Sequence, residues 1–560
     1  MRFKEWLRKK ILSKVGLVKY ESTPDDDRIT FINDEARLTK QRVEEYNVWY
    51  WGDSDELLNY YTHQNTLEYN YEPWHSRNKQ EYFWSISSTE TGSKRTHSGQ
   101  PRNIVDTLVN IIKFPKIAVG SLIGEEDAAN KNLSAILKAC NLKQIYKQQQ
   151  MPMTLVEGWG CYKINWDKNI SDYPYVVYYR ANNVDFIYAA GRIVGIVFKD
   201  YYTDGENRRY LLTETRSLKY DEATGKRNLV IEKELFKTVK DAEEYVVKAD
   251  FNEVPELANT EKYVEIGPYD DLLAVPCIFF ENTFKTGGYG RSIFTGKLDL
   301  FDDLDQCLSQ SSNSIRRSTP IEWVDSEFLE RDKKTGLPIQ PKAYDRKYTV
   351  YRGQIDAEGG TGRDPVQITQ PQINFTQYTD AAVAILLQIV NGIMAPATLG
   401  IDIAKKDNAE AEREKEKQTI FTRNALTEVE EDILRKTCVQ LLCAYEFMTK
   451  NEITVKDYDI SIKFSEFADD SYENKLEKLG AAYDSQQISD DMYMDKLYGD
   501  TLSRADYNRE LKWLREKHTE PREEGMEGAA GGGANLPGML DNMTNGGGSD
   551  GEGEPNEEEI

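Results

Sequence analysis

Two stretches with apolar side chains at helical spacing, separated by a short insert, constrain the fold of this chain more than any other feature. In 291–316 and again in 373–395, apolar residues recur every three or four positions, which is typical of an amphipathic helix. A proline follows each stretch and ends it, because proline cannot continue a helix. The insert, 317–372, holds many Gly and Pro and only short strand fragments. The pattern predicts two helices of about 23 residues, roughly 35 Å each, joined by a compact insert.

The segments on either side of this helix pair differ in kind. From about 153 to 280, runs of β-branched and aromatic residues alternate with turn sequences such as TDGENR and DEATGKR. This alternation predicts a mostly antiparallel β-rich region. The other predicted elements are helices at about 101–115, 129–150, 407–450, 471–484 and 490–517, and a strand at 460–467.

The charge of the chain is strongly negative and unevenly placed. Lys and Arg number 71 against 95 Asp and Glu, a net charge of −24, and 519–560 alone carries eleven acidic residues and one Arg. An acidic body does not suit a protein that wraps DNA by neutralising its phosphates, but it suits one that DNA passes without sticking. The segment 519–560 also holds eleven Gly without an apolar period, so it is predicted to be disordered.

Two segments near the N-terminus each allow two interpretations. Residues 1–20 carry seven Lys and Arg against one Glu, with apolar residues at helical spacing. This basic amphipathic helix either anchors to a membrane surface or an acidic partner, or docks on its own protein. Residues 46–84 contain twelve aromatic residues. They form either a stacking platform for bases or sugars, or, more commonly for such a pattern, part of a helical core.

Motifs for familiar chemistry are missing or imperfect. The nearest match to a phosphate-binding loop, GRSIFTGKL at 290–298, has five residues between its glycines and Leu298 in place of the hydroxyl residue. HExxH and GxSxG do not occur. An acidic cluster either holds Mg²⁺ or complements the dipole of the helix that contains it. The cluster consists of Asp299, Asp302, Asp303 and Asp305.

Cysteine, histidine and hydropathy exclude further classes of protein. Six Cys, none in a CxxC pair, do not suit a disulfide scaffold or a structural zinc site. Only four His are present, so a histidine-based active site is poorly supplied. No apolar run of about 18 residues or more occurs, so no membrane-spanning helix is expected.

Four stretches, in their order along the chain, resemble one known family. They are GWGCYKINWD (158–167), YGRSIFTGKLDLFDDLDQCLSQSSNSIRR (289–317), NAEAEREKEKQTIFTRNAL (408–426) and DDSYENKLEKLGAAYDSQQISDDMYMDKLYG (469–499). They look like the opening of the β region, the first stem helix, the start of the long helix and the C-terminal helical segment of portal proteins from tailed, siphovirus-type bacteriophages. The resemblance covers roughly 45–517, and the order of the elements supports it more than any one motif does.

The resemblance implies an α+β portal fold with a helical and β-rich wing, a two-helix stem, a small α/β clip, a long wing helix and a helical crown. By position, the parts would be a basic N-terminal helix and arm (1–44), the wing (45–290), the first stem helix (291–316), the clip (317–372), the second stem helix (373–395), the tunnel loop (396–407), the long wing helix and strand (408–467), the crown (468–518) and a disordered acidic Gly-rich tail (519–560).

The first stem helix is expected to turn a polar stripe toward a channel. Its acids would repel DNA phosphates and keep the duplex centred and sliding. The alternative is that these residues lie between subunits, with the acids placed only for the helix dipole. The stripe consists of Asp299, Asp302, Asp303, Gln306, Gln310, Asn313 and Arg317.

The tunnel loop and the clip supply the other expected contacts. In the loop, Lys405 and Lys406 would form a positive ring at the narrowest point of the channel. The alternative is that these lysines cap a turn or pair with the nearby acids Asp402, Asp407 and Glu410. The apolar loop residues expected to pack on the next subunit are Leu399, Ile401 and Ile403. The clip residues expected to contact partners are Glu322, Glu327, Glu330, Arg331, Lys333 and Lys334.

The resemblance implies a portal, or head-tail connector, in the virion at one capsid vertex, and in the host cytoplasm during assembly. A dodecameric ring would let terminase pump double-stranded DNA through it, and DNA would later leave by the same channel. The expected partners are further copies of the chain, the terminase large subunit, the major capsid or scaffold protein, a head-completion or tail connector protein, and the DNA.

No enzymatic activity is expected from the chain itself, because pumping DNA would need an external ATPase. We therefore expect no catalytic residue, no cofactor and no metal site. Two alternatives remain open. The chain is either a nucleic-acid or carbohydrate hydrolase that uses a pair of carboxylates, or another virion scaffold or adaptor protein.

Overall fold

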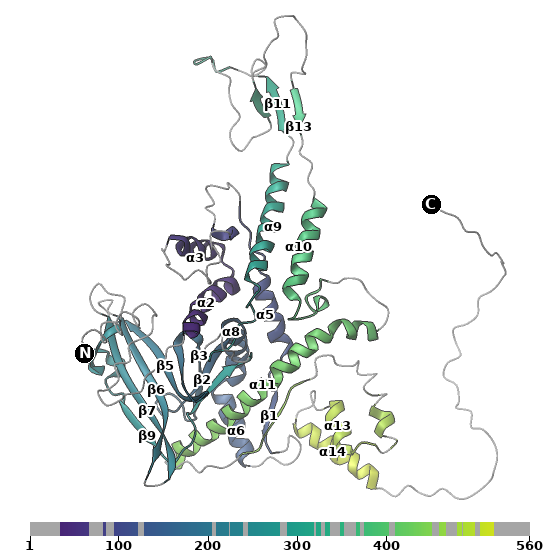
Figure 1. Ribbon diagram of the computed structural model, residues 1–560. Helices are drawn as coiled ribbons and strands as arrows, with labels where there is room; N and C mark the ends of the chain where they lie inside the picture. Colours follow the sequence, from purple (N-terminus) through teal and green to yellow (C-terminus); the bar gives the residue numbers. More distant parts are fainter. Residues whose placement is uncertain are drawn as a thin grey trace, which may run out of the picture. The chain divides into compact units, whose positions relative to one another are not determined.

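The computed structural model describes most of the chain between Asp34 and Thr519 (Figure 1). The described residues are 34–66, 82–85, 94–120, 128–203, 209–222, 225–238, 245–280, 288–318, 321–325, 331–336, 348–351, 366–369, 375–401, 409–450, 458–465, 476, 479–483, 485, 487–498 and 504–519. They belong to two compact units, one within 1–470 and one within 471–560. Of the described residues, 52% are helical and 24% lie in strands, which confirms the α+β class.

Helices precede the sheets of the first unit, and their aromatic residues build part of its core. Trp49, Tyr61 and Trp84 are fully buried, and Trp49 Nε1 donates to Tyr61 Oη at 2.8 Å. For these residues the interpretation as core is confirmed, whereas Trp51 is half-exposed and part of the aromatic segment lies outside the described residues. The elements are α2 (Asp34–Trp51), α3 (Ser54–Thr66), η2 (Phe83–Ser85), α5 (Gln100–Ile111), α6 (Ala128–Ala139), α7 (Leu142–Ile145), the π-helix η3 (Tyr146–Gln150) and α8 (Met151–Glu157).

Two antiparallel sheets follow, as predicted for 153–280. In the smaller sheet, β2 (Trp159–Asn165) lies between β10 (Ala274–Ile278) and β3 (Tyr175–Arg180). The larger sheet has the order β4-β5-β6-β7-β8, and β9 also pairs with β7. Its strands are β4 (Val184–Ala189), β5 (Arg192–Thr203), β6 (Arg209–Asp221), β7 (Lys226–Thr238), β8 (Tyr245–Lys248) and β9 (Tyr263–Ile266). Short 3-10 turns lie between strands: η4 (Ala181–Asn183), η5 (Phe251–Glu253) and η6 (Pro255–Leu257).

The longest described helix, α11 (Ala409–Lys450), covers the smaller sheet. It packs against β2 and β10, and its residues Leu434, Cys438 and Leu441 belong to the main hydrophobic core. A two-stranded antiparallel sheet, β1 (Lys116–Val119) with β14 (Ile460–Lys463), also lies near this helix. The prediction of one long helix ending near Lys450 is confirmed.

The predicted helix pair is present. The helices α9 (Leu298–Arg317) and α10 (Phe375–Val390) pack against each other, and Figure 1 shows a small sheet in the connection between them. In that sheet, β11 (Ile321–Asp325) pairs in parallel with β12 (Tyr348–Tyr351) and antiparallel with β13 (Val366–Thr369). We call α9 and α10 the hairpin.

Both helices of the hairpin are shorter than predicted. The helix α9 begins at Leu298 rather than at 291, because the chain turns at Gly296, which has a left-handed φ of 78°. The helix α10 ends at Val390, and the turn after it contains Gly392 with a φ of 81°. The helix predicted at 129–150 is likewise divided, because Asn141 has a left-handed φ of 52° after α6.

The second unit contains two described helices. The helix predicted at 490–517 is described as α13 (Asp490–Tyr498) and α14 (Arg504–Thr519), which pack together. Met494 and Leu511 are buried between them. The basic helix expected at 1–20 and the tail from 520 onward lie outside the described residues. In the part of the chain that the structure describes, no helix combines the length and apolar character needed to cross a membrane.

Candidate functional site

The residues predicted to line a channel lie on α9, and the structure divides them between two faces of that helix. One face binds two earlier segments of the chain, 82–85 and 94–98. We call these the anchored segments. The other face borders α10 and solvent. The division decides which of the predicted residues remain available to a DNA duplex.

Polar side chains at intervals of three or four residues make up the first face of α9. We call them the anchoring stripe, and its members are Asp299, Asp302, Asp305, Ser309 and Asn313. Near the start of the helix, Tyr82 Oη donates to Asp299 Oδ1 at 2.5 Å and the Phe83 N–H donates to Asp302 Oδ2 at 2.8 Å. Farther along, the Thr96 N–H donates to Ser309 Oγ at 2.9 Å, and Asn313 Nδ2 donates to the Lys94 carbonyl at 3.3 Å. The stripe therefore satisfies backbone N–H and carbonyl groups of both anchored segments.

Asp305 is the centre of the anchoring stripe. It is fully buried, and its carboxylate accepts three hydrogen bonds. These come from His97 Nδ1 at 2.7 Å, the Ser98 N–H at 2.7 Å and Trp84 Nε1 at 3.1 Å. A buried carboxylate is tolerated when its oxygens are satisfied in this way, and it then fixes the positions of its donors.

Asp302 does not lie where the predicted channel stripe requires. Its side chain is 5% exposed, and it accepts hydrogen bonds from the N–H groups of Phe83 and Trp84. Burial raises the pKa of its carboxyl to about 7, although the two N–H groups oppose this shift. The prediction that Asp302 faces a channel is wrong, because the anchored segments cover it within one subunit. Asp299 also contacts them, and so does Asn313.

The second face of α9 keeps part of the predicted polar stripe. Asp303 and Gln310 are exposed, and Gln306 is half-buried beside them. Together with Gln377 and other α10 residues, they line a hollow of about 470 Å³ between the two helices. The side chain of the remaining stripe member, Arg317, lies outside the described part. Within the described ranges, no group of three or more His, Cys, Asp or Glu side chains is arranged to hold a metal ion.

The hairpin also exposes large apolar side chains, on a face of α10 that includes the exposed Asp380. On α10, Phe375 is 56% exposed, and Val383 and Leu387 are each 41% exposed. With 3.6 residues per turn, Val383 lies about 120° and Leu387 about 80° around the helix axis from Gln377. The α9 residue Ile315, which the sequence pattern assigned to a buried stripe, is also exposed. Large apolar side chains in contact with water on one side of a helix pair are a sign of an interface.

Polar contacts tie the base of the hairpin together. Lys297 Nζ, one residue before α9, donates to the carbonyls of Gln388 at 2.8 Å and Asn391 at 2.9 Å, at the end of α10. A cation in this position complements the negative end of the helix dipole. Farther along, Ser314 Oγ and Tyr378 Oη share a hydrogen bond of 3.2 Å.

The predicted tunnel loop is described only in its first part. The turn η9 (Pro396–Leu399) lies beside α11, where the Ala395 N–H donates to Thr419 Oγ1 at 2.9 Å. Leu399 and Ile401 pack against the main core of their own chain. This packing within the chain was not predicted. Ile403, Lys405 and Lys406 lie outside the described residues, as do Asp402 and Asp407. Glu410 lies in α11, but its side chain is not described.

The predicted clip residues are also only partly described. Arg331, Lys333 and Lys334 are exposed on a turn that Asp332 organises by accepting from the Lys334 N–H at 3.0 Å. Glu322 lies in β11, and its side chain is not described. Glu327 and Glu330 lie outside the described residues.

Sequence reasoning missed the pairing of α9 with the anchored segments. Asp305 and His97 are 208 residues apart, and no local sequence pattern indicates that their side chains meet. One signal was available. The residues of the anchoring stripe follow one another at helical spacing, next to the apolar stripe of the same helix, as expected for a face that binds another part of the protein. No protein-family model matches the chain, and no curated protein sequence matches it either.

Proposed function

We propose that the chain is a portal protein, a ring of identical subunits through which viral double-stranded DNA enters and leaves a capsid. The exposed apolar side of the hairpin carries the proposal. Phe375, Val383 and Leu387 lie in water in the single subunit, and packing against a neighbouring copy would remove them from it. At about 25 cal/mol per Å² of buried apolar area, such burial is a substantial driving force for association.

The proposal assigns the hairpin a head-to-tail interface, in which the exposed apolar side chains of one copy pack against a different surface of the next, away from the side that carries Asp303, Gln306 and Gln310. A head-to-tail interface repeats from copy to copy, and it yields a closed ring when the rotation between copies closes. The polar side would then border a wet channel.

The polar side of the hairpin suits passage of DNA better than binding of DNA. Asp303 is an exposed acid, and the neighbouring side chains are neutral amides. Repeated around a ring, they would present weak repulsion to phosphates and few strong contacts, so a duplex could slide. We infer that terminase and later a tail connector meet the small sheet β11-β12-β13, and that the second unit belongs to the crown.

The acidic cluster on α9 gives the hydrolase alternative no support. Paired catalytic carboxylates need access to a substrate. Asp302 and Asp305 are buried by the anchored segments and already accept hydrogen bonds from them.

The proposal is tested by the assembly state of the purified chain. We expect native mass spectrometry and negative-stain images to give rings with a central hole. The double variant Val383→Glu with Leu387→Glu should shift the protein to monomers, because two charges would have to be buried in the interface. The matched control, Gln377→Glu with Gln388→Glu, adds the same charge to the other side of α10 and should still form rings.

Two results would contradict the proposal. One is a wild-type chain that stays monomeric across salt conditions. The other is a control variant that dissociates while the Val383 and Leu387 variant keeps the ring, since the interface would then use the polar side.

A further inference from the structure

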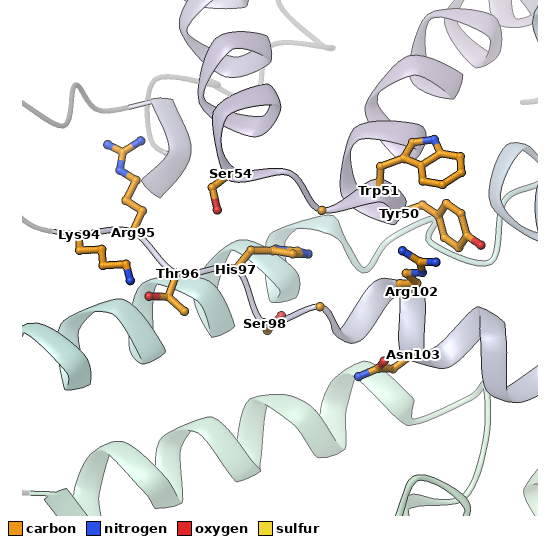
Figure 2. A pocket seen from close by; sticks show the side chains of 12 residues that line it. Tyr50, Trp51, Ser54, Lys94, Arg95, Thr96, His97, Ser98, Arg102 and Asn103 are labelled. Atoms are coloured by element: carbon orange, nitrogen blue, oxygen red, sulfur yellow. The ribbon is translucent and has the colours of Figure 1, made fainter.

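A second hollow, of about 470 Å³, lies where α2 ends and α5 begins (Figure 2). We call it the α5 hollow. All of its lining residues belong to one subunit, and they come from the end of α2, the start of α3, the anchored segment 94–98 and the first turn of α5. Its volume lies within the range of about 300–1,000 Å³ that is usual for small-molecule sites.

The lining of the α5 hollow is cationic in an acidic protein. It includes Lys94, Arg95 and Arg102 and no Asp or Glu, whereas the whole chain has a net charge of −24. Figure 2 shows Arg102 extending toward Tyr50 and the indole of Trp51. Its Nε lies 3.4 Å from Asp106, so the outer nitrogens of the guanidinium stay available to an anion. Arg95 turns away, and its Nη1 donates to the Trp84 carbonyl.

The first turn of α5 adds a second source of positive potential. The helix has 12 residues, and its N-cap residue, Gly99, has a left-handed φ of 69° and offers no side-chain cap. Pro101 has no N–H and the Gln100 N–H lies 3.5 Å from Ser98 Oγ, so the Arg102 N–H is the first-turn donor left to an anion, at the end of the helix where the dipole favours negative charge. An anion placed in the α5 hollow would meet both.

His97 supplies an independent sign of a ligand. Its side chain is only 7% exposed, and Asp305 holds its Nδ1. Its other nitrogen, Nε2, is buried and without a hydrogen-bond partner among the described residues, and His97 is one of the residues that line the α5 hollow. Gly52 permits this placement, because a Cβ there would lie 2.6 Å from Nε2.

Trp51 adds an aromatic surface to the α5 hollow. Its indole is half-exposed at the edge of the hollow, beside the buried ring of Tyr50. Every nucleobase has a flat face that stacks on an indole without sequence preference. A flat ring and an anion are therefore recognised within one small space.

We propose that the α5 hollow binds a nucleotide, with its phosphate at Arg102, His97 and the start of α5 and its base on Trp51. The same chemistry is offered by a free nucleotide and by the phosphorylated end of a DNA strand. The inference does not depend on ring formation, because one chain supplies the whole site. Its failure and that of the portal proposal are therefore separable.

Equilibrium dialysis of the full chain against adenosine 5′-monophosphate, adenosine and inorganic phosphate tests the proposal. We expect the nucleotide to bind at least tenfold more tightly than either fragment, because only the nucleotide reaches both the cationic group and the indole. The same measurement on monomers and on rings should give the same affinity. Binding of adenosine as tight as that of the nucleotide, or no binding of the nucleotide at millimolar concentration, would overturn the proposal.

Two exposed side chains allow variants with matched controls. Arg102→Gln should weaken nucleotide binding about tenfold, and Trp51→Ala at least fivefold. The control Arg509→Gln removes an exposed arginine that likewise pairs with an aspartate one turn away, and Trp513→Ala removes an exposed indole in the second unit. Both controls should bind as the wild type does. Equal weakening in controls and test variants would count against the site.

Further probes identify the source of the nucleotide and exclude another class of partner. One probe is a short oligonucleotide with a 5′-phosphate, compared with the same oligonucleotide without it. If only the phosphorylated form competes with the nucleotide, the natural ligand is a DNA strand end. Binding of the free nucleotide alone identifies a metabolite. Both results support the proposal. A peptide of residues 549–560 that binds more tightly than the nucleotide would overturn it in favour of an acidic protein segment.

Discussion

Two adjacent aspartates on α9 have opposite surroundings. Asp302 is buried under the anchored segments, where it holds two backbone N–H groups, whereas Asp303 is exposed beside the hollow between α9 and α10. The difference comes from residues about 219 positions earlier in the chain, which cover one face of the helix and leave the other open. An acidic residue on a helix can thus hold other segments of its own subunit in place or remain exposed to solvent, depending on which part of the chain covers it.

The comparison has an energetic side. An exposed carboxylate is hydrated at no cost, so replacing Asp303 should change stability little. A buried carboxylate keeps its place through its hydrogen bonds, and removing it leaves buried donors without partners, each of which costs about 1–3 kcal/mol. Substitutions along α9 should therefore separate the two faces.

The largest effect is expected at the centre of the anchoring stripe. Asp305→Ala would leave the Ser98 N–H, His97 Nδ1 and Trp84 Nε1 without their acceptor. We expect a loss of about 3 kcal/mol in the free energy of unfolding, measured by chemical denaturation. Asp303→Ala is the control on the open face and should change it by less than about 0.5 kcal/mol. Equal effects at the two positions would show that the anchored segments do not cover α9.

A pH dependence should distinguish Asp302 from Asp303. Because the folded pKa of Asp302 is raised to about 7, the folded chain holds a proton that the unfolded chain releases near pH 4. This stabilisation is complete below the unfolded pKa and is lost as pH rises through about 7. We expect it to fall by about 1.4 kcal/mol per pH unit between pH 5 and 7.

The asparagine variants isolate that contribution. Asp302→Asn has no proton to lose at this position, so its free energies of unfolding at pH 5 and pH 8 should differ by about 3 kcal/mol less than those of the wild type. Asp303→Asn should keep the wild-type difference. If both variants kept the wild-type difference between pH 5 and pH 8, the titrating group would not be Asp302.

The smallest expected effect lies toward the end of the anchoring stripe. Ser309 accepts from the Thr96 N–H at 2.9 Å and donates to the Thr96 carbonyl at 3.4 Å, and Ser309→Ala removes both of these neutral hydrogen bonds. We expect a loss of about 1 kcal/mol, together with faster hydrogen exchange at Thr96. Gln310→Ala, one residue further on the open face, is the comparison. Protection at Thr96 that survives Ser309→Ala would place its partner elsewhere.

The hairpin could be predicted from the sequence because its signal is local. Apolar residues at helical spacing mark α9 and α10 whatever else the chain does. The predicted ends of these helices were wrong because glycines with a left-handed φ, such as Gly296, turn the chain within the apolar pattern. The antiparallel strands were predicted for the same reason, since alternation and turn residues are read from neighbours.

The surroundings of the sites could not be predicted from local patterns. The channel stripe was selected by polarity along α9, but Asp302 is covered by a segment that has no periodicity and lies far away in sequence. The α5 hollow combines Trp51, His97 and Arg102, which belong to the end of one helix, a connecting segment and the start of another. Such groupings depend on tertiary packing, and one sequence alone does not encode them as a motif.

The contact of Lys297 with the end of α10 has a mechanical consequence. Its ammonium joins the residue before one helix to the last carbonyls of the other, so the two helices cannot spread apart at their base without breaking two charge-assisted hydrogen bonds. A force applied to the small sheet β11-β12-β13 would reach both helices together, and the hairpin would tilt as one lever. Its motion would then be carried to the anchored segments, which contact α9 from Asp299 to Asn313.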